Sequence, residues 1–169
     1  MNSKHIVKWS TRINNPTFAA QSAIIHASYH STRILVQRIS VLPLQPESSE
    51  LPNPNGISYD DDVSICVDSA RILAEIINYQ LEHDIAKVHC MADAAHSGAA
   101  LLIRYVWWLK AKEKAQQEEL QDIKPPLAHI IDEIMGYIAI FTRALETAAP
   151  RSEMAAQALY ASRLPLESH

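Results

Sequence analysis

The clearest pattern along this chain is an apolar side chain at alternating intervals of four and three residues in its C-terminal third. The positions are Leu127, Ile131, Ile134, Ile138, Phe141 and Leu145. This spacing places all six residues on one face of an α-helix, and Pro125 and Pro126 before them suit its first turn. Ordering the backbone of such a helix costs about 1–2 kcal/mol per residue, so its apolar face is expected to pack against other elements.

A second helix is predicted over residues 16–39. Asn15 can accept an exposed backbone N–H, and Pro16 is tolerated at the first helical position. The residues expected to form its apolar face are Ala20, Ala23, Ile24, Ala27, Ile34 and Leu35.

Three more helices are expected, over residues 61–83, 85–117 and 150–162. Carboxylates precede the first two, at residues 60–62 and at Asp84, where they can cap free N–H groups and favour the positive end of the helix dipole. Pro150 suits the first position of the third. In this last helix the residues expected to face inward are Met154, Ala158 and Leu159.

Five helices without recurrent apolar–polar alternation predict an all-α fold, arranged as an irregular antiparallel helical array. A length of 169 residues, 48% of them hydrophobic, allows one domain with a core, placed at 16–164. Residues 1–15 lack periodicity and are predicted to be a flexible lead-in. Residues 42–59, rich in Pro, Asn and Ser, predict a long loop after the first helix, and 165–169 predict a tail.

Charge and hydropathy exclude two classes of partner. The net charge is −4 and the basic residues are scattered, so direct DNA binding is not expected. The apolar run at 94–109 is shorter than the roughly 20 residues of a membrane span and contains His96 and Arg104, which predicts a buried core helix and no membrane contact. The first 15 residues hold no continuous apolar core of a secretory signal.

Few side chains suggest chemistry. Cys66 and Cys90 lie in apolar helical sequence, where a thiol is expected to act as a small hydrophobe and not to form a disulfide. A nucleophilic pair of Cys90 with His89 or His96 is the alternative, but their apolar neighbours favour a packed helix.

Metal binding is also weakly indicated. His26 and His30 share a helix face, yet two imidazoles do not make a site, and the aspartates at 60–62 are explained as a helix start. A small enzyme built from these groups is therefore the least favoured class. We predict no catalytic residue, no metal site and no cofactor in this chain. The adjacent Trp107 and Trp108 point about 100° apart on a helix, so only one can be fully inward.

Two segments resemble a known family. Residues 29–44 read YHSTRILVQRISVLPL, and residues 64–77 read SICVDSARILAEII. A helix that ends near an Arg, a variable loop and then a Cys-bearing helix with small residues resemble the middle homology regulatory domain of fungal zinc-cluster transcription factors. The residues that carry the resemblance are Tyr29, Leu35, Arg38, Cys66, Ala70 and Arg71, each with an expected structural role. The sequence departs from the family at Gln37, where His is usual, and at Ile39, where Pro is usual.

The resemblance, over residues 29–164, implies the C-terminal part of a regulatory domain that resides in the nucleus. It implies action through intramolecular, effector or protein-partner contacts and not by catalysis. Zinc is expected only in the six-cysteine DNA-binding cluster of this family, which the present sequence lacks. The missing upstream part of the same regulator is one expected partner.

The alternative is a generic helical interaction scaffold. In that case the stripe that contains Ile138 docks a partner or pairs two copies as a homodimer. Replacing Ile138 with Asp would then abolish association and leave the helices intact, whereas unfolding would assign the stripe to the monomer core.

Overall fold

The computed structural model describes residues 15–41, 59–119 and 127–163, and within them it contains helices and no strand. The elements are α1 (Pro16–Val41), α2 (Tyr59–His83), α3 (Ile85–Val88), the 3₁₀ turn η1 (His89–Met91), α4 (Ala92–Glu119), α5 (Leu127–Ala148), the 3₁₀ turn η2 (Ala149–Arg151) and α6 (Glu153–Arg163). The predicted all-α class is confirmed. Of the loop predicted at 42–59 and the lead-in predicted at 1–15, residues 42–58 and 1–14 lie outside the described residues, as does the tail at 165–169, whereas Tyr59 already belongs to α2.

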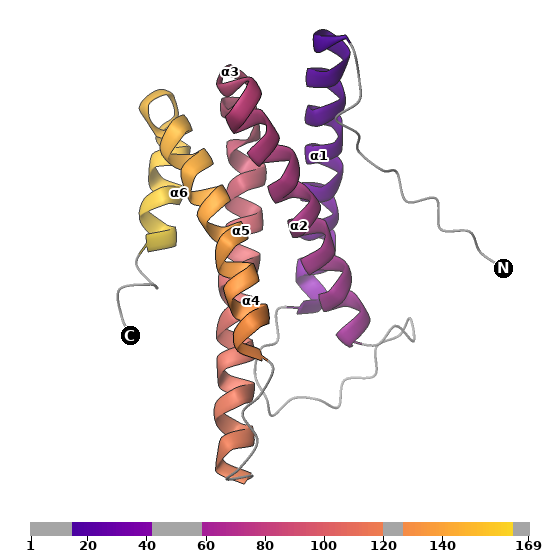
Figure 1. Cartoon of the computed structure of the whole chain (residues 1–169), viewed down its shortest axis with the longest axis vertical. Helices are drawn as coiled ribbons and strands as arrows, with labels where there is room; N and C mark the ends of the chain where they lie inside the picture. Colours follow the sequence, from indigo (N-terminus) through magenta and orange to yellow (C-terminus); the bar gives the residue numbers. More distant parts are fainter. Residues whose placement is uncertain (1–14, 42–58, 120–126, 164–169) are drawn as a thin grey trace, which may run out of the picture.

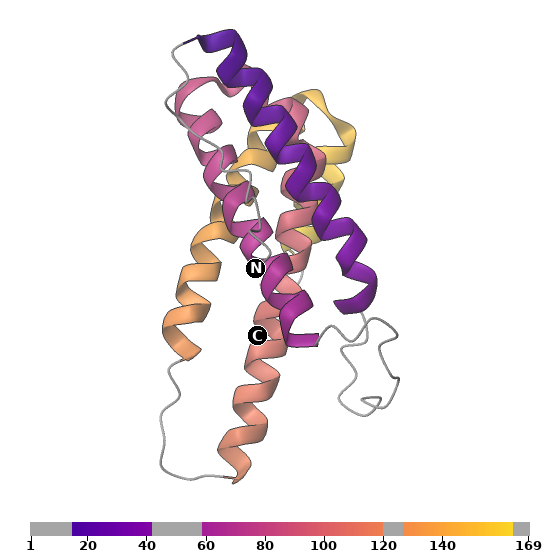
Figure 2. The same ribbon diagram turned by 90° about the vertical axis from the view of Figure 1, so that its right-hand side faces the viewer.

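The long helices form an antiparallel array (Figure 1). Helix α2 runs back along α1, α4 runs back along α2, and α5 runs back along α4. Helix α4 is central, because it packs against α1, α2, α5 and α6. Helix α1 lies at the edge of the array, and Figure 2 views the molecule from its side. One face of α1 is thus covered by neighbours and the other is not.

Asn15 starts α1 as the sequence predicts. Its side-chain Oδ1 accepts the backbone N–H of Thr17 at 2.9 Å and that of Phe18 at 3.4 Å. The two caps predicted for carboxylates, at residues 60–62 and at Asp84, differ from the prediction. Helix α2 begins at Tyr59, so the aspartates at 60–62 lie within its first turn and not before it. Asp84 occupies the cap position of α3 without a side-chain hydrogen bond, and its carbonyl accepts the Lys87 N–H instead.

The predicted helix over residues 85–117 is not a single α-helix. It is divided into α3, η1 and α4, and the turn at residues 89–91 has 3₁₀ geometry. The ψ angles are −32° at Val88 and −35° at His89, against −42° at Ala92. Less negative ψ values favour hydrogen bonds between residues three apart, which tighten the helix while the backbone stays right-handed.

The last helix begins later than predicted. Pro150 belongs to η2, and the backbone becomes extended at Ser152, with φ −144° and ψ 111°. The Ser152 Oγ then accepts the N–H of Ala155 at 3.2 Å, which makes Ser152 the cap of α6.

The hydrophobic core draws on every long helix, and two residues expected in it lie elsewhere. Ala23, Ala27 and Ile34 of α1 are buried as predicted, but Leu35 is exposed because it is rotated about 100° from Ile34. Met154 of α6 is also exposed, since Ala155 and Ala158 form the buried face.

The apolar run of α4 lies in the core, as predicted. Leu102, Val106 and Leu109 are buried among the other helices. None of the described helices meets the length and hydropathy of a membrane span. Trp107 is exposed, and the half-buried Trp108 stacks on Tyr105 with ring centroids 5.8 Å apart.

Candidate functional site

The two segments that resemble the regulatory family pack on each other. The first belongs to α1 and the second to α2, and these two helices lie antiparallel in extensive contact. The buried Cys66 thiol of α2 donates a hydrogen bond to the Gln37 Oε1 of α1, with Sγ and Oε1 3.7 Å apart. Ala70 is fully buried one turn further along α2. Cys66 and Ala70 therefore have the structural role that was expected.

The motif residues of α1 other than Gln37 have no part in the Cys66 hydrogen bond. Tyr29 and Leu35 are exposed on α1, and the Arg38 side chain lies outside the described part of the structure. Because Tyr29 and Leu35 are 51% and 43% exposed, the structural role expected of them stays a prediction.

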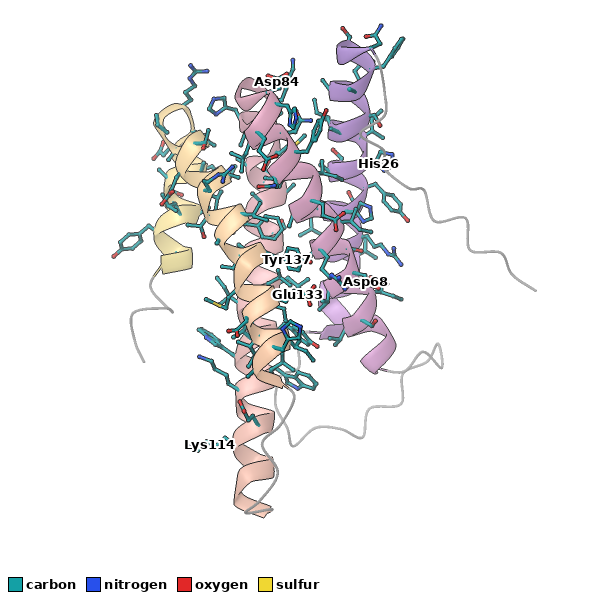
Figure 3. The ribbon with its side chains drawn as sticks, viewed as in Figure 1. His26, Asp68, Asp84, Lys114, Glu133 and Tyr137 are labelled. Carbon is teal, nitrogen blue, oxygen red and sulfur yellow. The ribbon has the colours of Figure 1, made fainter. Side chains whose placement is uncertain are left out.

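Arg71 connects α2 to α5. Its guanidinium lies 3.1 Å from the Glu133 carboxylate and 4.0 Å from that of Asp68. The Tyr137 hydroxyl donates to Glu133 at 3.0 Å, and the Arg71 Cζ lies 5.9 Å from the centre of the Tyr137 ring. Figure 3 shows Asp68, Glu133 and Tyr137 at this junction of the two helices. The sequence did not single out Glu133 and Tyr137, although their spacing of four placed them on one helix face.

This polar cluster joins α2 to α5 at the surface of the domain. A hydrogen bond with the Tyr137 hydroxyl, together with the carboxylates of Glu133 and Asp68, raises the pKa of Arg71 despite its partial burial. Arg71 keeps its charge at any physiological pH in either case. Half-exposed ion pairs contribute about 1 kcal/mol or less, so the cluster aligns α2 with α5 and leaves most of the stability to the core.

The histidine and cysteine candidates do not form a centre. No group of three metal-ligating side chains occurs in the portion of the chain that the structure describes. Cys66 and Cys90 are free thiols, and Cys90 is exposed, so the expectation of a small buried hydrophobe is wrong for Cys90. The His89 Nε2 lies 3.4 Å from the Arg151 guanidinium, and among the described residues no hydrogen bond joins the Cys90 thiol to a histidine.

His30 is buried in the contact of α1 with the rest of the domain. Neither of its ring nitrogens has a hydrogen-bond partner among the described residues. Burial, followed by the charges of Arg33 and His26, lowers the pKa of His30. The imidazole is therefore neutral at physiological pH, as a packed core residue must be.

We expect the domain to lose stability on mild acidification because of His30. The folded state holds the pKa of His30 below the ordinary histidine value of about 6.5, so the unfolded chain binds a proton more readily. The His30 contribution is complete above about pH 6.5 and is lost as the pH falls toward the folded pKa, at up to about 1.4 kcal/mol per pH unit. Urea unfolding followed by circular dichroism between about pH 5 and about pH 7.5 measures it.

The variant His30→Leu is expected to flatten this pH dependence. The matched control is His129→Leu, which changes an exposed histidine of α5 and should leave the slope as in the unchanged chain. Equal slopes for all three proteins would show that His30 is not the responsible group.

The stripe of α5 belongs to the core. Ile134, Ile138, Phe141 and Leu145 are buried against α2, α4 and α6, and Ile131 is half-buried. The Leu127 side chain lies outside the described part. The interpretation of this face as an interaction surface is therefore wrong for the four buried residues, since the monomer already covers them.

An uncovered apolar face lies instead on the outer side of α1. We call this set the α1 stripe: Phe18, Ser22, Ile25, Tyr29, Thr32 and Val36. Its four large members are between 51% and 67% exposed. This exposed apolar face was not predicted from the sequence, although its residues follow one another at intervals of four and three along the helix.

Searches with protein-family models, among curated proteins and among solved structures returned no match to this chain.

Proposed function

We propose that this chain is a helical regulatory module that acts in the nucleus through contacts with proteins, of the kind found in the fungal zinc-cluster transcription factors that it resembles. The observation that carries the proposal is the contact of α1 with α2, in which Cys66 meets Gln37. The two motif segments are separated by a long stretch of sequence, and yet they form one packed unit. This is the arrangement expected if both motifs belong to one conserved type of helix pair.

The exposed side of the same helix pair supports action by protein contact. Tyr29 and Leu35 come from the first motif segment, and both are uncovered. Contiguous exposed apolar patches on a protein surface often mark sites of protein interaction. The module thus has an inner side that holds the domain together and an outer side available to a partner.

A tethering experiment tests the proposal. The full chain is fused to a DNA-binding domain of known specificity and expressed in a fungal cell with a reporter gene that carries the matching site. We expect the fusion to change reporter transcription several-fold relative to the DNA-binding domain alone. The matched control is the fusion with Ile138→Asp, which disrupts the core and should lose the effect. A folded nuclear fusion without any effect on the reporter contradicts the proposal.

The isolated chain is expected not to retard duplex DNA in a gel-shift assay at about 150 mM salt. Its net charge of −4 provides no basic surface to neutralise phosphates. Specific retardation under these conditions would contradict the expectation that another part of the regulator, and not this chain, binds DNA.

A further inference from the structure

The α1 stripe lies on the side of the helix that faces away from the domain. At about 100° per residue, its mean direction is roughly 150° from that of Ala23, Ala27 and Ile34, which face the core. Its four large side chains are exposed, although the Tyr29 ring also contacts the buried His30 ring edge to face, and the stripe has no charged residue along its whole length. Intervals of four and three residues are those at which one helix packs along another.

The order of residues in the α1 stripe is symmetric about its middle. Two large residues, Ile25 and Tyr29, are flanked by the hydroxyl side chains of Ser22 and Thr32. Large residues again end the stripe on both sides, as Phe18 and Val36. If two copies pack antiparallel with their middles aligned, large residues meet large ones and hydroxyl meets hydroxyl. A surface that matches itself in this way is what a two-fold dimer requires.

Charge is compatible with the same pairing. Helix α1 contains no Asp or Glu, and in the antiparallel arrangement Arg33 falls opposite Gln21 of the second copy, so the two Arg33 side chains do not meet. With the axis at residue 27, His26 of one copy falls opposite Ser28 of the other. The six positions of the α1 stripe include no Asp, Glu, Lys, Arg or His, so a second copy brings no acidic or basic side chain of its own stripe into the seam.

The exposed apolar area of α1 sets the expected strength of the association between two copies. The four large side chains of the α1 stripe leave on the order of 500 Å² of apolar surface per copy, which is within the range of about 300–600 Å² for the largest apolar patch of a monomer, a patch that is often functional. Two copies would bury about 1,000 Å² together, which is near the lower limit of a specific interface. The expected dimer is weak and depends on concentration.

We propose that two copies of this chain associate through their α1 stripes, packed antiparallel about a two-fold axis close to residue 27. The inference deepens the proposed function by naming a second copy as a partner, and it rests on that function for its biological role. The association itself is measured on the purified chain without a transcriptional readout, so either idea can fail while the other stands.

Sedimentation equilibrium of the full chain from about 10 µM to about 1 mM tests the association. We expect the mean mass to rise from that of a monomer toward that of a dimer. Ile25→Asp is expected to raise the dissociation constant at least tenfold, because it places two carboxylates in the seam. The matched control, Ile130→Asp on exposed α5 surface, should behave like the unchanged chain. A mass that stays monomeric throughout, or association of Ile25→Asp equal to that of the control, overturns the proposal.

Disulfide trapping tests the direction of packing. In a Cys90→Ser background, which removes the exposed thiol and leaves the buried Cys66, the double variant Ser22→Cys with Thr32→Cys is expected to form covalent dimers on mild oxidation. Each single variant should not, because its two thiols would lie about 15 Å apart along the seam. Efficient cross-linking of a single variant, or none of the double variant, overturns the antiparallel arrangement.

Discussion

Replacing Ile138 with aspartate is expected to unfold the helical domain and not to separate two folded copies. Ile138 is 2% exposed and lies among the buried residues of α5 and its neighbours. A carboxylate placed there without a partner costs several kcal/mol, which is comparable to the whole stability of a domain of this size, at about 5–15 kcal/mol. Far-ultraviolet circular dichroism and urea unfolding should show loss of helix or a midpoint shifted far toward zero denaturant.

Ile130→Asp is the matched control for this experiment. It introduces the same charge into the same helix, but Ile130 is exposed, so the free energy of unfolding should change by about 0.5 kcal/mol or less. If Ile138→Asp instead remains fully helical and merely loses self-association, the α5 stripe is an interface after all and its assignment to the core is incorrect.

Replacing Gly98 with alanine is expected to destabilise the domain, although alanine is the better helix former. A Cβ atom at Gly98 of α4 would lie 2.5 Å from Cζ and 2.7 Å from Cε2 of Phe141, whose ring is fully buried. Because the ring has no free space to enter, relief requires movement of α4 against α5. We expect a loss of about 1–3 kcal/mol, which exceeds the gain of about 1 kcal/mol from helix propensity.

The substitution Gly136→Ala in the neighbouring helix α5 is expected to have the opposite effect on the stability of the domain. No atom lies within 4 Å of a Cβ at Gly136, so this substitution should stabilise the domain by about 0.5–1 kcal/mol. Phe141→Leu combined with Gly98→Ala should lose less stability than the sum of the two single changes, since the smaller side chain makes room. Urea unfolding of the four proteins gives this coupling energy, and strict additivity would contradict the close contact of Gly98 with Phe141.

The resemblance to a regulatory family and the contact of α1 with α2 address different questions. The resemblance came from short motifs, while the structure explains why residues at those positions matter for packing, through Cys66 and Gln37. The side-chain oxygen of Gln37 accepts a hydrogen bond from the Cys66 thiol, so the buried thiol has a polar partner.

Local signals were reliable where the chemistry was local. The cap formed by Asn15 depends on atoms two and three residues away, so the sequence predicted it. Other boundaries depended on competition between neighbouring groups. Ser152 replaced Pro150 as the start of α6 because its hydroxyl reaches the Ala155 N–H, and the turn at His89–Met91 tightened without any glycine or proline to signal it.

The sequence by itself determined that this chain is helical, which face of α5 is buried, and that the long apolar run of α4 belongs to a core. On α5 the intervals of four and three residues gather apolar side chains on one face, and that face leaves water when it packs against the other helices. Helix α1 was different, because it is apolar on two sides. The sequence predicted that Ala23 and Ala27 face inward, where small side chains let α1 approach α2 closely, but only the tertiary structure decided that Leu35 and the large residues of the α1 stripe stay exposed.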